Sequence, residues 1–159
     1  MSRAFVKESD GSEPIQLEER QISPDRNFVT ESGLALIDDK IEQLKQQLAL
    51  DNVKIDEMEI AQLSRDLRYW QARRTSAEAI IPQQDDRVAF GHYIMLEDKD
   101  NKITYRIVGQ DEADPNQGLL SYTAPLSKLL IGKSVGEEVS IGDRIWEIIA
   151  IKITTYYDK

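Results

Sequence analysis

The chain has 159 residues, a formal net charge of −9 and a pI near 4.7. An acidic surface repels phosphate, so this balance argues against a broad electrostatic grip on nucleic acid and favours a basic protein surface as partner. The chain has no cysteine and a single histidine, His92, which excludes disulfides and thiolate sites and nearly excludes imidazole-rich zinc sites and Ser-His-Asp triads. No apolar stretch has the length of a signal peptide or a membrane span, so we expect a cytoplasmic protein with no membrane contact.

The first 27 residues are charged and turn-prone, with Pro14 and Pro24 and few apolar side chains. Such a composition buries too little surface to offset its chain entropy. We therefore predict a flexible tail over residues 1–27, with a short docking peptide as the alternative.

Residues 28–80 have the pattern of two antiparallel helices. The Thr30 hydroxyl can accept a backbone N–H of the first turn and cap the first helix. Apolar residues then recur at steps of three and four, as in a coiled coil. They are Leu34, Ile37, Ile41, Leu44 and Leu48 in one stripe and Ile55, Ile60, Leu63, Leu67 and Trp70 in the other. If the chain folds back at Asp51-Asn52, each apolar residue of the first stripe lies opposite one of the second. This pairing predicts a coiled-coil hairpin about 30 Å long. We expect its second helix to end near Ala79.

After a linker at residues 81–86, short apolar segments and turn signals predict a small sheet domain over residues 87–159. The expected strands cover residues 87–96, 102–108, 119–122, 137–141 and 144–154, and a short helix covers 125–130 with proline in its first turn. The predicted fold class is α+β, with the hairpin followed by an antiparallel sheet carrying a small helix on one face.

Three segments carry a resemblance to a known family. They are Phe28–Leu48, Arg87–Leu96 with its Phe90-Gly91 step, and Tyr105–Gly136, which includes the strings VGQDEAD, LLS, APL and LIGK. In this order they resemble the Gre (GreA/GreB) transcript-cleavage factors. The resemblance implies an antiparallel coiled coil, a linker and an FKBP-like C-terminal domain. It also implies binding to the core of bacterial RNA polymerase at its secondary channel.

Two departures from the family pattern bear on activity. The family usually has Ser or Thr where this chain has Ala124. The hairpin is also short and lacks the family's Gly-Asp-Leu-x-Glu-Asn-type tip, whose carboxylates help the polymerase hold a second Mg²⁺. Asp51 and Asp56 are the candidate substitutes, since Mg²⁺ prefers oxygen ligands. The alternative makes Asp51 a turn residue and Asp56 a charge at a helix start, which we prefer. No cofactor is expected beyond a Mg²⁺ shared with the polymerase.

The resemblance also indicates a polymerase-binding surface on the sheet domain. This surface would have an apolar centre and a charged rim, as small protein–protein interfaces do. The candidate residues are Asp111, Glu112, Asp114, Ala124, Pro125, Leu126 and Lys133.

Other features have two interpretations each. The arginines at positions 65, 68, 73 and 74 could contact RNA, but they spread around the second helix and fit solvated charges better. Trp70 could stack on a base, but it falls on the apolar seam and fits the core better. His92 fits a packed or exposed strand residue better than a catalyst.

Our hypothesis is a monomeric, non-enzymatic elongation regulator without strong cleavage stimulation. An indirect contact with nascent RNA in the complex stays open. One alternative is an active cleavage factor that uses Asp51 and Asp56. Another is an FKBP-like prolyl isomerase, which only the fold suggests, and fold alone does not carry function.

Overall fold

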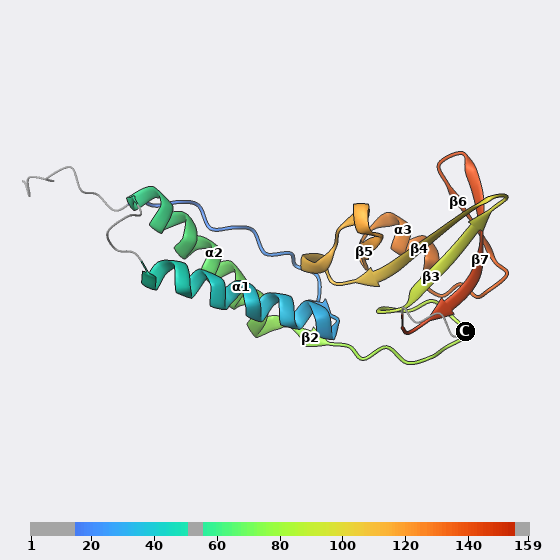
Figure 1. Cartoon of the computed structure of the whole chain (residues 1–159), viewed down its shortest axis with the longest axis horizontal. Coiled ribbons are helices and arrows are strands. Elements are labelled where there is room, and N and C mark those ends of the chain that lie inside the picture. Colours follow the sequence, from blue (N-terminus) through green and yellow to red (C-terminus); the bar gives the residue numbers. More distant parts are fainter. Residues whose placement is uncertain (1–14, 51–55, 155–159) are drawn as a thin grey trace, which may run out of the picture.

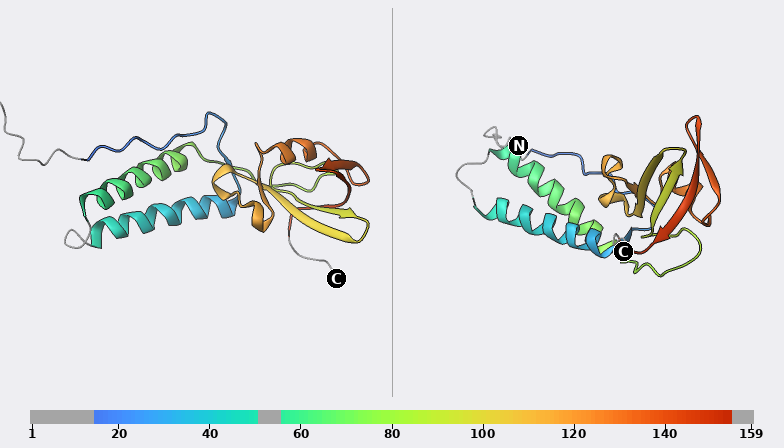
Figure 2. Two further views of the ribbon diagram at one scale, coloured as in Figure 1. Left: turned by 90° about the horizontal axis from the view of Figure 1, so that it is seen from above. Right: turned by 45° about the vertical axis from the view of Figure 1, so that its right-hand side comes forward.

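The computed structural model describes residues 15–50 and 56–154 and has two parts, a helical arm and a sheet domain (Figure 1). The arm consists of α1 (Glu31–Leu50) and α2 (Glu57–Ser76), which run antiparallel and project from one end of the sheet domain. In all three views the arm and the sheet domain lie end to end, so the molecule is elongated (Figure 2). Within the described residues, no helix is both long and apolar enough to cross a membrane.

The apolar seam of the arm confirms most of the predicted stripe. Ile37 and Leu44 are buried. The half-buried positions are Leu34, Ile41 and Leu48 on α1 and Leu63, Leu67 and Trp70 on α2. The exception is Ile60, which is 36% exposed near the outer end of the arm. Ile55, its predicted neighbour in the stripe, lies outside the described residues.

The inner end of the arm differs from the prediction. Phe28–Val29 form a short strand, β1, which pairs in parallel with β2 (Glu78–Ala79). The amides of Glu78 and Ile80 donate to the carbonyls of Asn27 and Val29 at 2.8 and 2.9 Å. The predicted end of the second helix near Ala79 is therefore wrong. The helix stops at Ser76. The Ala77 amide still donates to the Arg74 carbonyl at 3.3 Å, but the Glu78 amide donates to the Asn27 carbonyl instead of continuing the helical pattern.

The cap of α1 is confirmed. The Thr30 hydroxyl accepts a hydrogen bond from the amide of Gly33 at 3.1 Å, which satisfies one of the free N–H groups of the first turn.

Residues 15–27 belong to the part of the chain for which the sequence predicts a flexible tail. They form an extended segment without helix or strand that follows α2 from its outer half to the sheet domain (Figures 1 and 2). This segment is held along its length by ion pairs and hydrogen bonds rather than by the burial of apolar side chains. Residues 1–14 of the predicted tail lie outside the described residues.

The sheet is mixed rather than antiparallel. Its strands are β3 (Tyr93–Asp98), β4 (Asn101–Val108), β5 (Leu119–Ser121), β6 (Glu138–Ile141) and β7 (Arg144–Lys152), in the order β5-β4-β3-β7-β6. β4 and β5 are parallel, with Ile107 opposite Leu120, and the other pairs are antiparallel. Two short 3₁₀ helices, η1 (Gln110–Glu112) and η2 (Pro115–Gln117), return the chain so that β5 starts at the same end as β4. This reversal has no hydrophobic period in the sequence, which is why the prediction missed it.

The core lies between the sheet and α3 (Pro125–Leu130). Its members are Val88, Ile94, Leu96, Ile107, Leu120, Leu130, Val139, Trp146, Ile148 and Ile151. The first predicted strand starts at Tyr93 instead of Arg87, because the preceding residues form a loop closed by His92. The imidazole Nδ1 accepts from the amide of Ala89 at 3.0 Å, and Nε2 lies 2.7 Å from the carbonyl of Gln83. This buried histidine is a packing residue.

Candidate functional site: a docking face and the arm joint

The apolar centre of the predicted docking surface lies on α3. Pro125 occupies the first turn, where its missing N–H costs nothing, and it is exposed. Leu126 is half-buried against the core. Leu129 and Ile131 add exposed apolar surface on and just after the same helix, at 50% and 41%. Ala124 stands at the N-cap, and its methyl group makes no capping hydrogen bond.

The polar residues of the predicted surface divide into two groups. Asp114 and Lys133 stay near the surface. The Asp114 carboxylate accepts from the amide of Asn116 at 3.2 Å and caps η2, which leads through β5 to α3. The Lys133 carbonyl accepts from the amide of Val88 at 2.8 Å, so its backbone fixes the loop after α3. The carboxylates of Asp111 and Glu112 instead contact residues of the arm and its start.

Asp111 binds the helical arm. Its carboxylate pairs with Arg73 of α2 at 2.6 Å and accepts from the Tyr69 hydroxyl at 2.6 Å. The side chains of Arg73 and Asp111 are 2% and 6% exposed, so this ion pair is buried. Arg73 also donates to the Asn27 side chain at 2.7 Å, and the Asn27 amide donates back to the Arg73 carbonyl at 2.7 Å. A buried guanidinium with this many acceptors is well satisfied.

Glu112 binds the start of the arm. Its carboxylate accepts from the amides of Thr30 and Gly109 at 3.1 and 3.0 Å and from the Thr30 hydroxyl. Gly33 gives it room, because a Cβ at that position would lie 2.2 Å from the Glu112 carboxyl carbon. We call the set Asn27, Thr30, Arg73, Asp111 and Glu112 the joint. It connects the arm to the sheet domain through groups that face inward.

The sequence carries few signals of this joint. Its hydrogen-bonded partners are separated by up to 82 positions along the chain, and each charged residue taken alone has the pattern of an ordinary surface residue. Gly33 near the start of a helix was the one available hint, since a glycine inside a helix costs stability and often marks a close approach.

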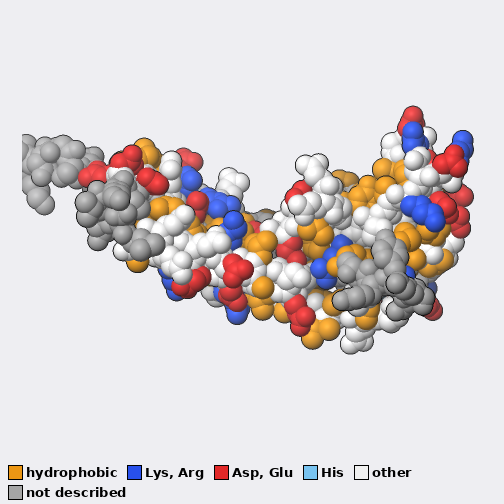
Figure 3. Space-filling model, in the orientation of Figure 1, with side chains coloured by type: hydrophobic (Ala, Val, Ile, Leu, Met, Phe, Trp, Pro, Cys, Tyr) orange, Lys and Arg blue, Asp and Glu red, His pale blue; other side chains and the backbone are white. Residues whose placement is uncertain are grey.

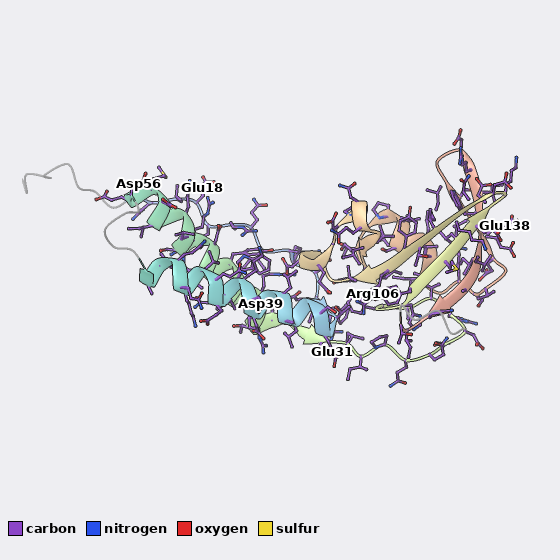
Figure 4. The ribbon with its side chains drawn as sticks, viewed as in Figure 1. Glu18, Glu31, Asp39, Asp56, Arg106 and Glu138 are labelled. Carbon is purple, nitrogen blue, oxygen red and sulfur yellow. The ribbon has the colours of Figure 1, made fainter. Side chains whose placement is uncertain are left out.

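The outer end of the arm supports the structural interpretation of Asp56. Its carboxylate accepts from the amide of Glu59 at 2.8 Å and caps α2. Figure 4 shows Asp56 at this outer end, with Glu18 nearby. Asp51 lies outside the described residues. Within residues 15–50 and 56–154, no group of three His, Asp or Glu residues could hold a metal ion.

The arginines of α2 all have acidic neighbours. Arg68 pairs with Glu19 at 2.6 Å, Arg74 with Asp38 at 2.7 Å, and Arg65 lies 3.7 Å from Asp66. Arg73 is buried in the joint. Acidic and basic side chains alternate over the arm, without a stripe of one sign on the face seen in Figure 3. This distribution indicates that the arginines of α2 pair with acidic residues of the same chain rather than contact RNA.

Tyr69 allows a pH test of the joint. Burial, and then its hydrogen bond to Asp111, raise the pKa of the Tyr69 hydroxyl to about 12. The unfolded chain releases this proton near pH 10, and the folded chain retains it. We therefore expect the contribution of Tyr69 to the free energy of unfolding to be constant below pH 10 and to fall as the pH rises from 10 to 12. An absorbance titration of phenolate should show a late transition that Tyr69→Phe removes. Ionisation of all six tyrosines near pH 10 would contradict this geometry.

Comparison with known proteins identifies the class of the sheet domain. Residues 83–153 match the family model described as transcription elongation factor, GreA/GreB, C-terminal. Over these residues the chain is similar to the C-terminal domain of the GreA/GreB factors.

Sequence comparison with curated proteins finds the same similarity. The chain is 44% identical over 86 residues to the transcription elongation factor GreA of Acidiphilium cryptum, covering 49% of this chain and 55% of that protein. It is 49% identical over 69 residues to the GreA of Nautilia profundicola, covering 40% and 43%. The chain thus spans about half the length of these curated relatives. The crystal structure of GreA factor homolog 1 (Gfh1) of Thermus thermophilus aligns with a TM-score of 0.40 at 16% identity, over 80% of this chain and 99% of that one. Because this TM-score is low, the similarity to GreA rests on the sequence matches alone.

Proposed function

We propose that this protein binds the core of bacterial RNA polymerase and regulates elongation at the secondary channel, without strongly stimulating transcript cleavage. The observation that carries the proposal is the GreA/GreB C-terminal domain over residues 83–153. The sheet domain would dock, and the arm would lie at the channel entrance. There it would compete with full-length Gre factors or alter pausing.

The docking surface in this proposal is centred on Pro125 and Leu126, with Ala124 beside them and Asp114 and Lys133 as its charged members. An exposed apolar point with a polar rim is the usual anatomy of a modest interface. Asp111 and Glu112 would act indirectly, because their carboxylates are occupied by the joint. Their role would be to set the position of the arm relative to the docked domain.

The weak cleavage activity follows from the arm. Two-metal catalysis needs carboxylates placed to within a fraction of an ångström, on an element long enough to reach the metal. α1 and α2 have 20 residues each, so the arm extends roughly 30 Å. The one described tip candidate, Asp56, already caps a helix. A side chain committed to a cap is poorly placed to serve as a metal ligand.

Stalled elongation complexes provide the functional test. We expect the wild-type protein to change the rate of pausing or elongation while leaving the RNA length intact. The double variant Asp51→Ala/Asp56→Ala should have the same effect on pausing, provided that circular dichroism shows the arm still helical. If the wild-type protein shortened the RNA and the double variant did not, the chain would be an active cleavage factor and the proposal would fail.

A further inference from the structure

Residues 15–27, which we call the strap, are attached to α2 by a specific charge pattern. The Glu19 carboxylate binds the Arg68 guanidinium through Nη2 at 2.6 Å and Nε at 2.9 Å. The next residue, Arg20, places its guanidinium 3.8 Å above the centre of the Tyr69 ring and 3.4 Å from the Asp66 carboxylate. Glu19 and Arg20 are adjacent and opposite in charge, and each meets an opposite charge on α2. A slip by one residue would bring like charges together, so the register of the strap is defined.

The other end of the strap is attached to the sheet domain and to β2. The Gln110 amide of η1 donates to the Ser23 hydroxyl at 3.0 Å. The Tyr122 hydroxyl, just after β5, donates to the Arg26 carbonyl. Arg26 also pairs with Glu78 of β2 through two hydrogen bonds, at 2.6 and 3.1 Å. The strap therefore contacts both parts of the molecule.

The geometry points to a brace: we propose that the strap fixes the angle between the helical arm and the sheet domain. The joint holds the arm only near its inner end. Arg68 lies five positions before Arg73 on α2, about 7.5 Å farther along the helix. A second attachment at that distance resists bending that a single attachment would allow. The brace is a property of the isolated protein, whichever partner it binds.

The brace and the joint differ in their sensitivity to salt. The Glu19–Arg68 pair is exposed, at 61% and 53%, whereas the Arg73–Asp111 pair is buried. Exposed pairs are screened at high ionic strength, and buried pairs are screened much less. High salt should therefore release the strap and leave the joint closed. A braced arm would also meet a partner without first losing orientational freedom, which lowers the entropy cost of binding.

Pulsed electron spin resonance on the full chain tests the brace. The sequence has no cysteine, so the exposed pair Gln46→Cys and Glu138→Cys would carry the only two spin labels, one on α1 and one on β6. With the native strap we expect one narrow distance distribution at low salt. Both the Glu19→Arg substitution and high salt should broaden this distance distribution. The charge swap Glu19→Arg/Arg68→Glu should restore the narrow distribution.

A matched control separates the brace from a general charge effect. Glu18→Arg makes the same change of charge one residue earlier, at an exposed position, and should leave the distribution narrow. Circular dichroism of each variant establishes that the helices are retained. Equal widths for wild type and Glu19→Arg would overturn the proposal. A broad distribution in the charge swap would overturn it as well, because the pair itself would then not be responsible. Neither outcome depends on polymerase binding.

Discussion

Arg73→Ala is expected to lower the free energy of unfolding by about 3–5 kcal/mol, because removing one partner of a buried ion pair leaves the other charge uncompensated. The partner here is Asp111, 6% exposed, which would retain only the Tyr69 hydroxyl as a hydrogen-bond donor among the contacts described above. Asn27 would also lose the guanidinium that its side chain accepts from. The measurement is equilibrium unfolding in urea, followed by circular dichroism.

Arg74→Ala is the matched control for that measurement. Arg74 is the next residue of the same helix and also forms an ion pair, with Asp38 at 2.7 Å. Its side chain is 45% exposed, and exposed pairs contribute about 0–1 kcal/mol. Both variants replace an arginine by alanine, so the difference between their free energies of unfolding measures the effect of burying the ion pair. Equal destabilisation by both would contradict the description of the joint.

Pro125→Glu is expected to weaken binding to core RNA polymerase strongly. Placing a carboxylate at the apolar centre of the proposed interface would desolvate an unpaired charge. A hot-spot residue near the centre of an interface contributes about 2 kcal/mol or more, which corresponds to roughly a 30-fold change in Kd. The fold should survive, because Pro125 is exposed and glutamate is accepted in the first turn of a helix. The measurement is the Kd of labelled protein for core polymerase at constant salt.

Asn101→Glu controls for the added charge. Asn101 is the exposed first residue of β4, and the substitution introduces the same carboxylate outside α3. We expect its Kd to stay close to that of the wild type. If both variants bound as tightly as the wild-type protein, α3 would not be the docking surface. If both lost binding equally, the effect would be one of net charge.

The parts of the fold that were predicted from sequence are those with a hydrophobic period. The stripe from Leu34 to Leu48 repeats every three to four residues, and Ile37 and Leu44 are indeed buried. The β3–β4 and β6–β7 hairpins were likewise marked by apolar runs around polar turns. The parallel β4–β5 pair was missed because the chain reverses through η1 and η2, which bury few apolar side chains.

The joint and the strap were missed for a different reason. Their contacts are between polar groups far apart in sequence, such as Arg73 with Asp111 and Glu19 with Arg68. A single sequence shows each of these residues as a charge without a partner. Reading Asp111 and Glu112 as a partner-facing surface was reasonable on that basis. Only the three-dimensional arrangement shows that both carboxylates bind the arm, and that Asp114, Pro125 and Lys133 remain toward the surface.

The most direct test of the account is the association of the unmodified protein with bacterial core RNA polymerase, measured by size-exclusion chromatography at physiological salt. A secondary-channel ligand should elute with the polymerase and be displaced by an excess of GreA. Elution entirely apart from the polymerase would contradict the proposed function, whatever the properties of the arm and its brace.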